Sequence, residues 1–90
     1  MVQRVGADLS GHDVELEFDR RRIVINKAVL RVDGEVVDST RIFYGERDLR
    51  TSLPDGTEIS VAVHSGMGGE LTRAQVREGD GSWRDLEPRG

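Results

Sequence analysis

Three arginines and a histidine in the second half of the chain are the residues whose types and spacing best suit ligand binding. The segments 49–53, 58–64 and 70–78 alternate apolar and polar residues, as neighbouring strands of one sheet would. Side chains two positions apart on a strand share a face. The outward face would then carry Arg50, His64, Arg73 and Arg77. Because guanidinium groups form paired hydrogen bonds with carboxylate and phosphate, this set predicts an anion-binding face.

The same arginines have a second interpretation, as surface charges that keep the sheet soluble. The chain contains 17 acidic residues, and opposite charges on neighbouring strands attract one another. Glu58 falls on the same predicted face as Arg50 and Arg77, where its carboxylate would neutralise them. We favour this interpretation, because most exposed charges serve solvation rather than binding.

A glycine-rich loop follows the predicted strand 58–64. Residues 65–69, Ser-Gly-Met-Gly-Gly, superficially resemble a phosphate-binding loop. They lack a lysine at the required spacing and the strand-to-helix context that such a loop needs. A flexible hairpin loop is the simpler prediction. The alternative is a mobile flap over a ligand, in which Met67 is an adaptable apolar contact.

Arrangements for catalysis or metal binding fail on spacing. His12 and His64 form no HxH, HxxxH or HExxH pattern, so the sequence predicts no metal site. Ser65 follows His64 directly, and adjacent side chains on a strand point to opposite faces, which rules out a Ser–His pair there. Glu15 and Glu17 share a face, but a solvated strand explains them better than a two-acid mechanism. No catalytic residue and no cofactor are predicted, and a non-enzyme is favoured.

The composition is that of one water-soluble domain. Ninety residues suffice for a single hydrophobic core. The net charge of −4 argues against nucleic-acid binding, and no apolar run approaches the ~20 residues of a membrane span. The first residues lack the apolar segment of a secretory signal, so a cytoplasmic location is expected. Lys27 is the only lysine among 13 basic residues, which is typical of GC-rich bacterial genomes.

Alternating runs separated by Asp-Gly turns predict an all-β fold. The turns fall at Asp33-Gly34, Asp55-Gly56 and Asp80-Gly81. The positions of these turns predict about seven short strands, arranged as a single compact antiparallel β-sandwich or a coiled meander. The predicted core consists of Val14, Leu16, Phe18, Ile23, Ile25, Leu30, Val32, Ile59, Val61 and Val63.

Some boundaries and segments are ambiguous. Residues 1–11 are expected to form a loose N-terminal arm, residues 12–87 the single β domain, and residues 88–90 a C-terminal tail. The apolar parity changes within residues 23–32, which predicts a bulge at Asn26-Lys27. The polar middle of residues 37–44 predicts a strand that is at an edge or bulged. Residues 70–78 fit a strand or a short helix, and the strand is favoured.

Two early segments resemble the Fas apoptosis inhibitory molecule domain. They are VELEFD, from Val14, and AVLRVDGEVV, which ends at Val37. That family is a compact non-catalytic β fold with a similar VDG hairpin after its early strands. The resemblance implies an all-β non-enzyme and covers residues 14–37 only. The later turn and the glycine loop depart from the family pattern, so no functional residue is carried over.

Two functions are compatible with these patterns. The first is a non-catalytic interaction or accessory module that recognises a protein partner or self-associates through an edge strand. The second is a small-ligand or anion-binding protein, or an enzyme, with its site near the 65–69 loop and the outer arginine face. The first is favoured, because every catalytic arrangement fails on spacing.

Overall fold

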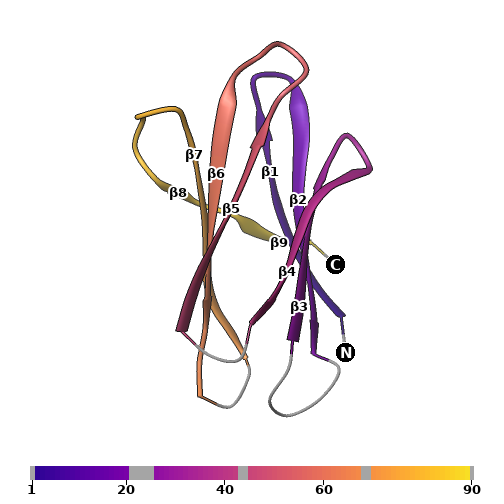
Figure 1. Cartoon of the computed structure of the whole chain (residues 1–90), viewed down its shortest axis with the longest axis vertical. Helices are drawn as coiled ribbons and strands as arrows, with labels where there is room; N and C mark the ends of the chain where they lie inside the picture. The colour runs from indigo at the N-terminus through magenta and orange to yellow at the C-terminus, as the bar shows by residue number, and fades with distance from the viewer. Residues whose placement is uncertain (1, 21–25, 43–44, 68–69, 90) are drawn as a thin grey trace.

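The computed structural model of the chain describes residues 2–20, 26–42, 45–67 and 70–89 (Figure 1). All regular secondary structure in these ranges is β. The strands are β1 (Val2–Leu9), β2 (His12–Arg20), β3 (Asn26–Val32), β4 (Glu35–Ile42), β5 (Gly45–Ser52), β6 (Glu58–Ser65), β7 (Leu71–Glu78), β8 (Arg84–Asp85) and β9 (Glu87–Arg89). Within the described ranges there is no helix of the length and apolarity that a membrane span requires.

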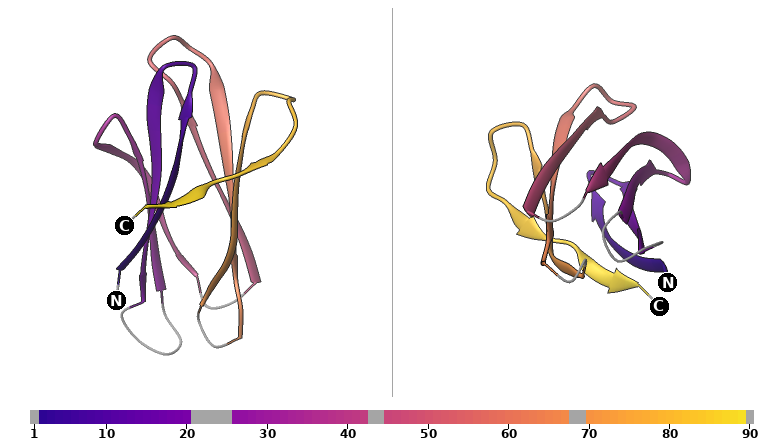
Figure 2. Two further views of the ribbon diagram at one scale, coloured as in Figure 1. Left: turned by 180° about the vertical axis from the view of Figure 1, so that it is seen from behind. Right: turned by 60° about the horizontal axis from the view of Figure 1, so that its bottom comes forward.

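The strands form two antiparallel sheets packed face to face, as the two views of Figure 2 show. One sheet has the order β4-β3-β2-β1-β9 and the other β5-β6-β7-β8. The first half of the chain builds the first sheet and the second half the other, except that β9 returns to pair with β1. The predicted antiparallel all-β fold is confirmed, and the described ranges contain nine strands where about seven were expected.

The two sides of this sandwich differ. On one side β8 runs through Leu86 directly into β9, so the chain crosses from one sheet to the other and joins them (Figure 2). Leu86 is buried there, and its N–H donates to the Ala74 carbonyl at 2.9 Å. On the other side β4 and β5 approach each other without hydrogen-bonded pairing, and among the described residues each has one strand neighbour. This side therefore carries two free strand edges.

The Asp-Gly turn after β3 has the geometry that its sequence predicts. Asp33 and Gly34 have φ angles of 52° and 87°, and Val32 lies opposite Glu35. Two central residues with positive φ form the turn type whose twist matches that of the flanking strands. Ser10 and Gly11, with φ angles of 52° and 80°, form the same turn between β1 and β2.

The expected loose arm and tail are wrong. Residues 2–9 form β1, because the Ser10-Gly11 turn folds them back onto β2 and their inward side chains Val5 and Leu9 enter the core. Residues 87–89 form β9 on the outer edge of β1, with Pro88 opposite Val5. Proline is tolerated on an edge strand, since no further strand needs its missing N–H.

The core lies between the sheets and comes mainly from alternating aliphatic residues. Eight of the ten predicted core residues are buried, and the other two, Ile23 and Ile25, lie outside the described residues. The buried apolar residues that the prediction lacked are Val5, Leu9, Ala28, Ile42, Leu49, Leu53, Ala62, Ala74, Val76 and Leu86. Apart from Ala62, they all belong to one hydrophobic cluster.

Two ambiguous segments are resolved. Residues 71–78 form strand β7, as favoured. The strand predicted over residues 37–44 is β4, which is both an edge strand and bulged, and its last two residues, 43 and 44, lie outside the described residues. The bulge is not at Asn26-Lys27, which lie in the regular part of β3. Instead Leu30 pairs with Asp38 and Arg31 with Val36, so Val37 is the extra residue. A bulge in β3 is therefore not the cause of the change of apolar parity near residue 26.

Candidate functional site

The predicted arginine face exists on the outer surface of the four-stranded sheet. Arg50 on β5 and Arg77 on β7 both lie opposite Ser60 on β6. Four residues further along β6, His64 lies opposite Arg73. The strand register thus confirms that all four side chains share one face. It also divides them into two pairs, which have different surroundings.

The pair at His64 and Arg73 is matched by acids. Arg73 Nε lies 3.5 Å from the Asp85 carboxylate, and His64 Nδ1 lies 3.7 Å from that of Glu46. More than half of the Arg73 and Asp85 side-chain surfaces is exposed, so water screens this ion pair and it contributes little to stability. This end of the face serves as a solvated surface, in line with the favoured interpretation.

The pair at Arg50 and Arg77 borders a polar hollow of about 540 Å³. Its wall consists of Arg50, Thr51, Ser52, Glu58, Ile59, Ser60, Arg77, Gly79 and Asp80. Among the described residues, neither Arg50 nor Arg77 forms an ion pair with an acid. Glu58 lies in the wall of the same hollow, as its expected place on this face requires. Whether its carboxylate neutralises the two arginines stays a prediction.

Arg77 is held in place by an aromatic ring. Its guanidinium carbon lies 4.7 Å from the centroid of the Trp83 ring, at cation–π distance. Arg77 Nε is buried and has no hydrogen-bond partner among the described residues. Trp83 directly precedes β8 and is 38% exposed, so its ring is partly accessible to solvent beside Arg77. Sequence reasoning missed this contact, because it depends on the short β7–β8 hairpin.

The glycine loop does not belong to this hollow. Met67 is 87% exposed, beyond the Ser65 end of β6, whereas the hollow lies at the Glu58 end. Five residues of extended strand between Ser60 and Ser65 correspond to about 17 Å. The predicted combination of a Met67 flap with the outer arginines is thus not formed as one site. Gly68 and Gly69 lie outside the described residues.

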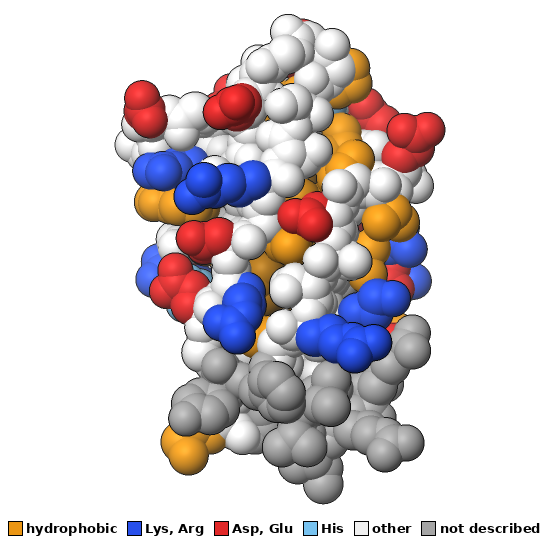
Figure 3. Space-filling view, viewed as in Figure 1, with side chains coloured by type: hydrophobic (Ala, Val, Ile, Leu, Met, Phe, Trp, Pro, Cys, Tyr) orange, Lys and Arg blue, Asp and Glu red, His pale blue; other side chains and the backbone are white. Residues whose placement is uncertain are grey.

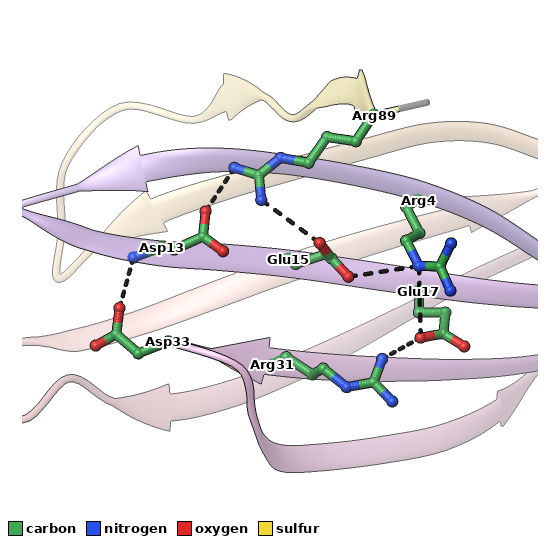
Figure 4. A network of polar contacts seen from close by, with 7 residues as sticks. All are labelled: Arg4, Asp13, Glu15, Glu17, Arg31, Asp33 and Arg89. Carbon is green, nitrogen blue, oxygen red and sulfur yellow. Dashed lines mark hydrogen bonds and ion pairs between the residues drawn. The ribbon is translucent and has the colours of Figure 1, made fainter.

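A second charged face, which the sequence analysis missed, covers the five-stranded sheet (Figure 4). Arg4 Nε lies 3.7 Å from Glu15 and 3.9 Å from Glu17, and Arg31 forms an ion pair with Glu17. Arg89 reaches from β9 to Asp13 at 2.7 Å and to Glu15 at 3.5 Å. The hydrogen bond from Arg89 to Asp13 is the main cause that raises the pKa of Arg89. Alternating charges thus neutralise one another across four strands.

Gly6 explains how Arg89 crosses the sheet. A Cβ atom at Gly6 would lie 2.4 Å from the Arg89 guanidinium carbon, so the guanidinium occupies the space above this glycine. At the far end of the same face, Asp33 accepts hydrogen bonds from the Asp13 N–H at 2.9 Å and pairs with His12 Nδ1 at 2.8 Å. The His12 contact, followed by the Asp13 N–H, lowers the pKa of Asp33. This network is structural, because each of these charges has a partner.

The free edge of β4 is the third candidate surface. Val36 and Val37 are 58% and 38% exposed there, beside the β3–β4 turn. Glu35 and Asp38 flank them, and neither acid has an ion pair among the described residues. Figure 3 shows hydrophobic side chains in a band between the two sheets on this side of the molecule. Sequence reasoning had identified this strand as able to pair with another chain.

The described part of the chain contains no candidate metal site. No group of three or more His, Asp or Glu side chains in the described ranges could hold a metal ion. His12 and His64 lie in different sheets, and each contacts a carboxylate of its own.

The site therefore has to be interpreted from its own geometry. No protein-family model matches the chain, and searches of curated proteins and of solved structures return no significant match.

Proposed function

We propose that this chain is a non-catalytic cytoplasmic interaction module that binds an extended segment of another protein along the β4 edge. The observation that carries the proposal is the asymmetry of the sandwich. One side is joined by β8 and β9, whereas on the other no described strand pairs with the outer edge of β4. Unpaired backbone N–H and C=O groups on such an edge are a template for strand addition.

The shape of β4 leaves room for an added strand at its beginning. In Figure 1 the β3–β4 hairpin bends away from β5, so the two edges diverge towards Glu35. Val36 and Val37 supply exposed apolar surface at this point. An added segment with apolar side chains would cover them, which removes apolar area from water.

Charge favours a basic partner over a second copy of the chain. Asp38 lies opposite Leu30, whose side chain is fully buried, so the Asp38 carboxylate is on the inner face of an edge strand. A charge that points inward on an edge strand opposes pairing with another edge of the same charge. Two copies paired through β4 would bring Glu35 and Asp38 close to the same acids of the other copy. A strand bearing Lys or Arg would instead neutralise them.

The resemblance of residues 14–37 to the Fas apoptosis inhibitory molecule domain supports the same class of function, since that family is non-catalytic.

A pair of synthetic peptides tests the proposal. One alternates Val with Lys and the other alternates Val with Glu, and calorimetric titration measures the Kd of each. We expect the Lys peptide to bind at least about tenfold more tightly, because it pairs with the acidic edge. The substitution Asp38→Asn should remove most of this difference, since its amide oxygen keeps the hydrogen bond with the Ser39 N–H but carries no charge.

Asp80→Asn is the matched control, because Asp80 is an exposed acid at the β7–β8 turn on the other sheet. It should leave the preference for the Lys peptide unchanged. Equal affinity of the two peptides, or an equal loss in both variants, would contradict the proposal. If sedimentation velocity shows a dimer and Val36→Lys abolishes it, the edge binds a second copy of the chain rather than a segment of another protein.

A further inference from the structure

The hollow between Arg50 and Arg77 contains two cations of one face that form no ion pair with any described residue, although the carboxylates of Glu58 and Asp80 also line it. Most other described arginines are matched: Arg4, Arg31, Arg73 and Arg89 form ion pairs, and Arg47 and Arg84 donate to backbone carbonyls. Arg50 and Arg77 instead flank Ser60 from neighbouring strands. Strands in a sheet lie about 4.8 Å apart, so their Cα atoms are roughly 10 Å from each other and the side chains reach over one small group.

Two features prepare this place for a ligand. The Trp83 ring fixes the Arg77 guanidinium at 4.7 Å, which reduces the conformational freedom that binding would otherwise remove. Arg77 itself lines the hollow, so its side chain is part of the wall that a bound group would contact. An oxygen ligand that enters the hollow would reach Arg50 and the Ser60 hydroxyl as well.

We propose that this hollow, named here the Arg50–Arg77 site, binds an oxyanion group, a carboxylate or a phosphate, of a small ligand. The planar fork of each guanidinium matches both groups. Glu58 and Asp80 also line the hollow, and their carboxylates repel a ligand of high negative charge. The site therefore takes a group of low charge rather than a polyphosphate. It is on the opposite sheet from β4, so it is independent of the docking edge.

Trp83 provides a direct readout, because it is the only tryptophan in the chain and contacts Arg77. The experiment titrates the protein with inorganic phosphate and, separately, with acetate, and sodium chloride keeps the ionic strength constant. We expect a saturable change in Trp83 fluorescence. At a concentration about tenfold above the Kd, the same anion should raise the Tm by about 6–11 °C. A stronger response to phosphate assigns a phosphate ligand, and a stronger response to acetate assigns a carboxylate ligand.

Arg50→Gln should weaken binding at least about tenfold, and it leaves the Arg77–Trp83 contact in place as the reporter. Arg73→Gln is the matched control, because Arg73 is on the same face but is paired with Asp85. It should change the affinity less than about twofold. Equal weakening by the two variants would overturn the proposal, as would a wild-type response to both anions no larger than that to chloride.

Discussion

Replacement of Val61 by Asp is expected to unfold the domain, or to destabilise it by several kcal/mol. Val61 is 0% exposed at the centre of β6. It lies between Leu49 on β5 and Val76 on β7, and both are buried with it. A carboxylate at this place has no cation within the core, and burial of an unpaired charge is among the most destabilising changes known. Thermal unfolding followed by circular dichroism measures the effect.

The loss should also depend on pH. Burial disfavours the charged form, so the pKa of the new carboxyl group is raised in the folded state. The folded state then binds a proton more readily than the unfolded state, and the destabilisation shrinks as pH falls below the raised pKa. Ser60→Asp is the control, since Ser60 points outward between Arg50 and Arg77 and should tolerate the charge. A Val61→Asp variant that melts like the parent would show that the faces of β6 are assigned wrongly.

Replacement of Phe18 by Ala has the second large effect, a loss of about 3–5 kcal/mol in the free energy of unfolding. Phe18 is the largest fully buried side chain among the described residues. It lies opposite Gln3 on β1 and Ala28 on β3. The Ala28 side chain is too small to fill the space that the ring would leave. The removed ring therefore leaves a cavity that the adjacent strands cannot close.

Urea unfolding measures this loss, and Phe18→Leu is the matched variant. Because Leu fills most of the volume, it should cost less than about 1.5 kcal/mol. A loss below about 1 kcal/mol for Phe18→Ala would place Phe18 at the margin of the core rather than between the sheets.

The sequence predicts the strands whose alternation is regular and whose turns are local. β2, β6 and the Asp33-Gly34 turn follow directly from these two signals. β1 and β9 escape prediction for different reasons. In β1 the inward residues are Val5, Ala7 and Leu9, and the exposed Val2 breaks the alternation. β9 contains a proline and owes its position to β1, so no local preference reveals it.

The candidate surfaces, too, could be predicted from the sequence only in part. Register alone places Arg50 and Arg77 on one face, and the sequence predicted that correctly. Whether either arginine forms an ion pair with Glu58 depends on side-chain conformation. The contact between Arg77 and Trp83 depends on β8, which has only two residues. The charged face around Arg89 could not be predicted once residues 1–11 and 88–90 had been excluded from the domain.

Amide hydrogen exchange with and without the Val–Lys peptide is the most direct test of the central claim, that β4 is the docking edge. The account predicts slower exchange at backbone amides of residues 35–41, because an added strand would hydrogen-bond to the outward N–H groups of β4. The amides of β1 and β7 should keep their rates. Protection that appears at the β8–β9 side of the sandwich, with none at β4, would contradict the account.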